Sequence, residues 1–261
     1  MTSGGILDGL LDLVFPRRCV QCGAAGGWLC EPCAGDLRPL PAQHCPRCGA
    51  PGPWAAPGQR HRAGRRCPEC GGRDLAFRSA AAAFTYEGPA KALITACKFR
   101  ALRSLADDMV GRASPAFAAA AGANVDLVTW VPGHRDHQME RGFNQAELLG
   151  RGFARRAGLP YAPLLRRVRH GARQSGLDRA GRAANVRHAF ALREGVNGVT
   201  RKLKRVLIVD DVYTTGETLD HCAEVLAHAG LEPHVFTFAR TVRATPSQAS
   251  LDHAVQKERC P

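Results

Sequence analysis

Two adjacent carboxylates stand beside a cluster of hydroxyl side chains late in the chain, where residues 206–219 read VLIVDDVYTTGETL. The short β-branched run Val206–Val209 predicts a buried parallel strand. Asp210 and Asp211 then lie where that strand ends, at the carboxyl edge of the sheet, where open α/β folds bind ligands. Carboxylates at such an edge can accept hydrogen bonds from sugar hydroxyls, which makes both aspartates candidate catalytic and binding residues.

The turn that follows the aspartates is suited to a phosphate group. Its backbone N–H groups converge at the N-terminus of the next helix, and the hydroxyls and the helix dipole add to the attraction for an anion. The predicted binding residues of this turn are Val212, Thr214, Thr215, Gly216, Glu217 and Thr218. One strand–turn–helix unit therefore offers two carboxylates and a monophosphate site, which together fit a sugar phosphate.

Other phosphate-binding motifs fit this stretch poorly. A Walker loop requires G-x-x-x-x-G-K-[ST], and the turn has no such lysine; a dinucleotide fingerprint requires G-x-G-x-x-G, and only Gly216 is present. The simpler alternative is a buried strand followed by an Asp-rich helix cap. A cap needs neither two adjacent acids nor three threonines around one glycine, so the sugar-phosphate site is favoured.

Four C-x-x-C pairs predict two structural zinc sites near the N-terminus. Two thiolates at this spacing chelate one tetrahedral Zn²⁺, and two pairs complete a closed Cys₄ site. The predicted ligands are Cys19, Cys22, Cys30, Cys33, Cys45, Cys48, Cys67 and Cys70. Sequence order favours one site from the first two pairs and one from the last two, while a cross-braced pairing stays open. Secreted disulfides are the alternative, and the lack of a signal sequence disfavours them.

The net charge of +13 has a single source along the chain. Residues 151–205 contain 15 Lys/Arg against two acidic residues, so the rest of the chain is balanced. Such a segment attracts polyanions, including pyrophosphate, nucleotides and nucleic acid, although a solvated arginine-rich surface explains it equally well. The sequence has no run of 18 uncharged apolar residues and no basic n-region, which predicts a cytoplasmic protein without a membrane span.

Strands and helices alternate after residue 79, which predicts an α/β fold with a parallel sheet flanked by helices. The expected strands are 80–86, 125–131, 206–209 and 234–239, and the expected helices are 88–99, 105–121, 144–157 and 217–229. The expected domains are 1–78, with an amphipathic helix at 6–15 and the double zinc ribbon, then the 79–242 α/β domain, then a disordered tail at 243–261. The Gly/Pro/Arg-rich segment 49–66 predicts a flexible loop between the third and fourth cysteine pairs.

Two further segments have the composition of anion-binding loops. The turn Pro132, Gly133, His134 and Arg135 follows the expected strand 125–131 and can present amides and cations to a diphosphate, or it is an ordinary turn. Arg141, at the start of the next helix, can also bind phosphate. The long loop 168–187 can close over a polyphosphate, or it is a solvated linker. Its candidate residues are Arg169, Gln174, Arg182 and Asn185.

These pieces resemble known families in their order and identity. The 206–219 stretch resembles the phosphoribosyl pyrophosphate (PRPP) signature of type I phosphoribosyltransferases. The C-x-x-C pairs, CKF at 97–99, VPGHRDHQMERGFNQAELL at 131–149 and the pattern R-x(4)-Q-x-x-L-x(4)-R-x-x-NV at 169–186 together resemble the ComF family. That resemblance extends from about residue 10 to residue 240. It implies a double zinc ribbon joined to a type I phosphoribosyltransferase-like domain.

The resemblance also implies a function. Asp210 and Asp211 would hold the ribose hydroxyls of PRPP, the threonine turn its 5′-phosphate, and Mg²⁺ would accompany the diphosphate. An acceptor nitrogen would then displace pyrophosphate. The alternative is a non-catalytic PRPP or nucleotide sensor that binds single-stranded DNA through basic loops and zinc ribbons. Natural competence, the competence helicase machinery as a partner, and oligomerisation belong to the same set of expectations.

Overall fold

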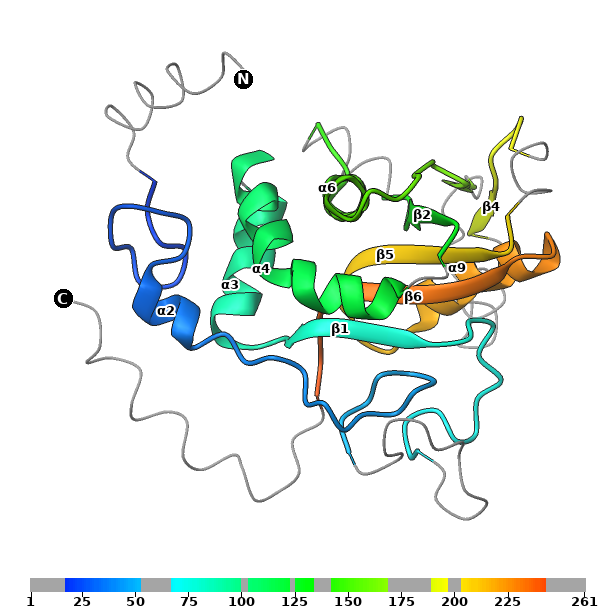
Figure 1. Ribbon diagram of the computed structural model, residues 1–261, viewed down its shortest axis with the longest axis horizontal. Helices are drawn as coiled ribbons and strands as arrows, with labels where there is room; N and C mark the ends of the chain where they lie inside the picture. The colour runs from blue at the N-terminus through cyan, green and yellow to red at the C-terminus, as the bar shows by residue number, and fades with distance from the viewer. Residues whose placement is uncertain are drawn as a thin grey trace, which may run out of the picture.

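The computed structural model describes residues 17–52, 67–99, 103–122, 125–133, 142–168, 189–196 and 203–242. The helix expected at 6–15 and the disordered tail expected at 243–261 lie outside these ranges, as does most of the loop expected at 49–66. Within the described ranges, a central sheet packs against helices, and the cysteine-rich segments, drawn in blue tones, lie along its margin (Figure 1).

A four-stranded parallel sheet confirms the predicted fold class. Its strands, in spatial order, are β1 (Ala80–Thr85), β6 (Glu232–Arg240), β5 (Arg205–Tyr213) and β2 (Leu127–Trp130). The side chains of β5 alternate between two buried clusters, Val206 and Ile208 in one, Leu207 and Val209 in the other. Because both faces of this strand are covered, its apolar run shows no polar alternation.

Helices cover both faces of the sheet, as predicted (Figure 1). One face packs against α3 (Gly88–Phe99), α4 (Arg103–Ala121) and α6 (Gln145–Ala157), and the other packs against α9 (Glu217–His228). The Asn144 side chain accepts a hydrogen bond from Ala146 N, and Gly158 ends α6 in a left-handed conformation with φ of 66°. These caps satisfy end groups that the helix itself leaves unpaired.

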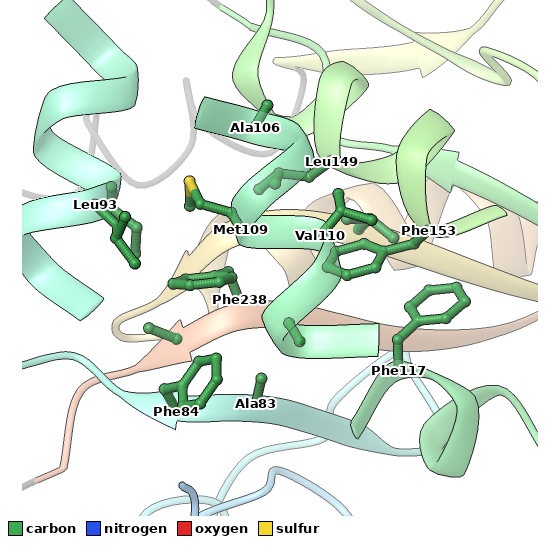
Figure 2. Close-up of a cluster of buried hydrophobic side chains, with 14 of the residues drawn as sticks. Ala83, Phe84, Leu93, Ala106, Met109, Val110, Phe117, Leu149, Phe153 and Phe238 are labelled. Carbon is green, nitrogen blue, oxygen red and sulfur yellow. The ribbon is translucent and has the colours of Figure 1, made fainter. Parts of the chain in front are cut away.

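Aromatic rings form the centre of the larger helical layer. Phe117 of α4 stacks on Phe153 of α6 with ring centroids 4.8 Å apart, and both rings meet the edge of Phe236 on β6 at 5.2 and 5.3 Å. Figure 2 shows the side chains from α4, α6 and β1 converging on this layer. Offset and edge-on ring pairs contribute beyond their buried area, so this cluster fixes α4 and α6 on the sheet.

The cysteine-rich segments are built into the two cores of the sheet. Cys19, and Cys33 within the short helix α2 (Glu31–Gly35), join the cluster formed by α3, α4 and α6. The second segment, with Cys45 and Cys67, joins the cluster on the α9 face together with Phe77. Each segment therefore shares its buried surface with a different side of the sheet.

One pair of strands was not predicted. Leu165–Arg167 (β3) and Phe190–Leu192 (β4) form a short antiparallel pair beside the main sheet. Each strand has only three residues and one fully buried side chain, so neither produces an apolar run that a pattern could detect. In the described ranges no helix has the length and apolar character needed to span a membrane.

Candidate functional site

The sheet narrows from four strands to three immediately before the two aspartates. Strand β2 pairs with β5 only as far as Val209, whose carbonyl accepts from Val131 N at 3.0 Å, whereas β6 continues beside β5 as far as Tyr213. Asp210 and Asp211 therefore lie within the strand, beyond the last residue of β2. The sequence placed them after the strand, because the apolar run stops at Val209 while backbone pairing with β6 continues.

The two carboxyl groups have different environments. Burial, and after it the charge of Asp211, raises the pKa of Asp210 well above its ordinary value. Asp210 Oδ1 also accepts a hydrogen bond from Asp211 N at 2.9 Å. Asp211 instead forms an ion pair with Lys98, whose Nζ lies 2.7 Å from Oδ2. The pair therefore combines a carboxyl group with a raised pKa and a carboxyl group that is ion-paired with a lysine.

Lys98 was not predicted as a site residue. It lies in the last turn of α3, and the ion pair brings that helix to the end of β5. In the sequence, Lys98 is noticeable only as part of the CKF motif at 97–99. That motif lies more than 100 residues before the aspartates, so its spacing does not indicate a contact with them.

The turn after the aspartates leads directly into α9. Thr214 and Thr215 are exposed, Gly216 takes a left-handed conformation with φ of 79° as the N-cap, and α9 begins at Glu217. Thr218, in the first turn of α9, is also exposed. The structure thus brings the hydroxyls and the first N–H groups of a 12-residue helix to the end of the strand that holds the aspartates.

Only part of the segment predicted to bind the diphosphate belongs to the residues that the structure describes. Pro132 and Gly133 come after Val131, the first residue beyond β2, and both are half-buried. Asn144 Nδ2 donates to Val131 O at 2.9 Å, which connects this turn to the start of α6. The remaining candidates lie outside the described residues: His134, Arg135, Arg141, Arg169, Gln174, Arg182 and Asn185.

Both cysteine clusters have the geometry of structural zinc sites. In each cluster the four Sγ atoms lie within 4.8 Å of one another, with 3.5 Å between Cys22 and Cys30 and 3.7 Å between Cys45 and Cys70. A tetrahedron with Zn–S bonds of about 2.3 Å has edges of about 3.8 Å, whereas a disulfide requires about 2.05 Å. The sites are Cys19, Cys22, Cys30 and Cys33, and Cys45, Cys48, Cys67 and Cys70. The sequential pairing is therefore correct, and the cross-braced alternative is not.

Comparisons with known proteins agree with this arrangement. A family model described as "Double zinc ribbon domain" matches residues 10–71. Competence protein F of Haemophilus influenzae is 37% identical over 103 residues, which cover 39% of this chain and 44% of the relative. Competence protein ComFC of Streptococcus pneumoniae is 31% identical over 100 residues, covering 38% and 41%. Over the stretch that they share, the chain is similar to these two competence proteins.

The chain also matches DNA utilization protein YhgH of Escherichia coli K12, at 33% identity over 106 residues, which cover 40% of the chain and 44% of the relative. It spans less than half the length of each of these relatives. Among solved structures it matches the glutamine PRPP amidotransferase from B. subtilis complexed with ADP and GMP, at 26% identity and a TM-score of 0.34, covering 50% of this chain and 25% of that one. An adenine phosphoribosyltransferase from Thermoanaerobacter pseudethanolicus matches at 19% identity and a TM-score of 0.30, covering 51% and 67%.

Proposed function

We propose that this protein, which resembles the ComF family, binds PRPP at the carboxyl edge of β5. The observation that carries the proposal is the succession, on one strand–turn–helix unit, of a carboxyl pair and an exposed threonine turn that opens α9. Asp210 and Asp211 suit the ribose hydroxyls. The hydroxyls and N–H groups of Thr214–Thr218 suit the 5′-phosphate.

The ion pair with Lys98 defines how Asp211 would bind a sugar. Lys98 Nζ occupies one oxygen of this carboxylate, and an ionised carboxylate has about four lone-pair positions. A ribose hydroxyl would therefore donate to a remaining position without displacing the lysine. The diphosphate would extend toward Pro132 and Gly133 at the end of β2, and Mg²⁺ bound to it would neutralise part of its charge.

Ribosyl-phosphate transfer is the second step of the proposal. An acceptor nitrogen would form a bond to C1′ while the C1′–oxygen bond to pyrophosphate breaks, and the bonding electrons would leave on pyrophosphate. Catalysis would then rest on positioning and on charge stabilisation, without a covalent nucleophile. Pyrophosphate release, measured against a panel of nucleobases, distinguishes an enzyme from a protein that only senses PRPP.

Replacement of Asp211 tests PRPP binding most directly. Asp211→Asn keeps the shape of the side chain but removes the charge that a ribose hydroxyl and Lys98 both use. Titration calorimetry with PRPP and Mg²⁺ should show roughly 10- to 100-fold weaker binding, the range of a charged hydrogen bond. The control is Asp107→Asn on the exposed side of α4, which should bind as the wild type does. A wild-type protein that gives no heat of binding overturns the proposal.

A second candidate function is binding of single-stranded DNA. The names of the relatives refer to competence and DNA utilization. In the described part of the chain, Arg151, Arg155 and Arg166 are exposed near one another in the sequence, and the Arg151 guanidinium lies 5.8 Å from the ring centroid of Tyr161. Tyr161 is 38% exposed, and the part of its ring that Arg151 does not cover could stack on a base. Cations beside an accessible aromatic ring are the usual elements of a single-strand site.

Salt dependence tests this second function. Each arginine that contacts a phosphate contributes about one unit to the slope of log affinity against log salt concentration. The double substitution Arg155→Ala and Arg166→Ala should therefore lower the slope by about two for a labelled oligonucleotide. Lys91→Ala, an exposed cation on α3, serves as the control and should leave the slope unchanged. An unchanged slope in the double variant contradicts this assignment.

A further inference from the structure

The second zinc ribbon makes direct contact with the threonine turn. Arg73, three residues after the last zinc ligand, donates from Nη1 to Thr215 O at 2.6 Å. Its Nη2 lies 4.0 Å from Asp220 in the first turn of α9, and Asp220 Oδ1 accepts from Ala76 N at 2.7 Å. The segment that leaves the zinc site is thus tied to both the turn and the helix that follows it.

A second chain of contacts runs beneath the turn. Arg240, at the end of β6, is 1% exposed, donates to Cys48 O at 2.6 Å and forms an ion pair with Glu69. Its guanidinium also lies over the Tyr213 ring, 4.1 Å from the centroid. The zinc ligand Cys48 and its neighbour in the ribbon, Glu69, therefore fix Arg240, and Arg240 fixes the tyrosine at the end of β5.

Tyr213 in turn supports the glycine of the turn. A Cβ placed on Gly216 would lie 2.3 Å from Tyr213 Oη, so the backbone of the turn rests against the tyrosine hydroxyl. Other hydrogen bonds of the turn are longer. Asp220 N donates to Gly216 O at 2.8 Å, Glu217 N to Thr215 Oγ1 at 3.4 Å, and Thr241 Oγ1 to Thr214 O at 3.4 Å. The bond from Arg73 of the ribbon to Thr215 O, at 2.6 Å, is shorter than these.

We propose that the second zinc ribbon holds the phosphate-binding turn in its binding conformation, with Arg73 as the principal positioning residue. A turn that binds an anion through its N–H groups works best when these groups are oriented before the ligand arrives, because the cost of ordering them is then not taken from the binding energy. The contact orients Thr215 through its carbonyl, which leaves the neighbouring N–H groups available to a ligand.

A cavity beside the turn is consistent with this role. It has a volume of about 460 Å³, and its wall is shared between the ribbon and the turn. The lining residues are Glu69, Arg73, Tyr213, Thr214, Thr215, Glu217 and Thr241. Arg73 therefore also places a positive charge at the edge of the space next to the proposed phosphate position.

Two readouts on Arg73→Ala test the proposal. The side chain of Arg73 is 36% exposed, so its truncation should leave the melting temperature and the two zinc ions per chain unchanged. Hydrogen exchange of the Asp220 amide, which donates to Gly216 O of the turn at 2.8 Å, should become about tenfold faster, which corresponds to about 1.4 kcal/mol. The affinity for PRPP with Mg²⁺ should fall by a similar factor. Arg78→Ala, at an exposed arginine before β1, is the matched control and should change neither quantity.

The exchange measurement is independent of the proposed function from which the ligand was taken. If wild-type protein fails to bind PRPP while Arg73→Ala accelerates this exchange, the ligand assignment fails and the positioning role stands. If exchange of the Asp220 amide is the same in Arg73→Ala and in the wild type, the positioning role is overturned, whatever the ligand.

Discussion

A chelator should remove the two zinc ions in two separate phases, and only the second phase should unfold the α9 side of the sheet. The two sites differ in their access to solvent. In the first site Cys22 is exposed and Cys30 is half-buried, whereas the four ligands of the second site are between 0% and 8% exposed. The first ion is therefore open to attack by a competing ligand, and the second is reached only after the structure opens.

The consequences of losing each ion should differ as well. The second site lies in the same buried cluster as Phe77 and Tyr213, and it fixes Arg240 through Cys48 O. Structural zinc contributes on the order of 10 kcal/mol of binding free energy that is coupled to folding, which is comparable with the whole stability of a domain. Without the ion, four buried thiols and a buried arginine would lose their arrangement together.

Zinc release can be followed with a chromogenic chelator while circular dichroism reports on the fold. The first equivalent should leave quickly with a small spectral change, and the second should leave slowly, together with the loss of helix signal. Cys22→Ser should remain folded with one zinc per chain, and Cys48→Ser should be insoluble or strongly destabilised. Simultaneous release of both ions, or release of the second ion with the helix signal intact, would contradict this prediction.

Local sequence patterns were sufficient to predict much of the fold. The C-x-x-C spacing identifies zinc ligands because both thiolates lie in one short turn, and the apolar periodicity of segments such as 144–157 identifies helices. The strand end was misplaced because hydrophobicity marks burial of side chains, while β5 continues to Tyr213 through backbone pairing with β6. The sequence also left the pairing of the cysteines open, since only the three-dimensional structure shows which pairs meet.

The contacts around the site could not be predicted from patterns. Arg240 bonds to residues 171 and 192 positions earlier in the chain, and no periodicity relates such positions. A basic side chain at the end of a strand is normally exposed to solvent. Arg240, however, is buried against the zinc ribbon. Lys98 is likewise distant from Asp211 in the sequence, so no local pattern predicts their ion pair.

Substitution of Gly216 by alanine should weaken PRPP binding by about 100-fold. A displacement of the binding groups by about 1 Å can cause a loss of this size where function depends on their exact placement. Two effects combine here. The backbone has φ of +79°, and a Cβ would meet Tyr213 Oη at 2.3 Å and Cζ at 2.5 Å. The left-handed conformation costs an alanine about 1–2 kcal/mol, and forced overpacking adds about 1–3 kcal/mol. Tyr213 cannot turn aside freely, because Arg240 packs on its ring.

Gly230→Ala separates the two effects. Gly230 follows the same helix, has φ of +82° and has nothing within 4 Å of its Cβ position, so it reports the cost of the backbone conformation alone. Its melting temperature should fall by about 2–8 °C with PRPP binding unchanged, whereas Gly216→Ala should lose about twice as much stability and the binding as well. If the two variants melt alike and both bind PRPP as the wild type does, the turn is not held against Tyr213. The double variant Tyr213→Ala, Gly216→Ala should remove the steric conflict without restoring affinity, because the turn then lacks the support that connects it to the zinc ribbon.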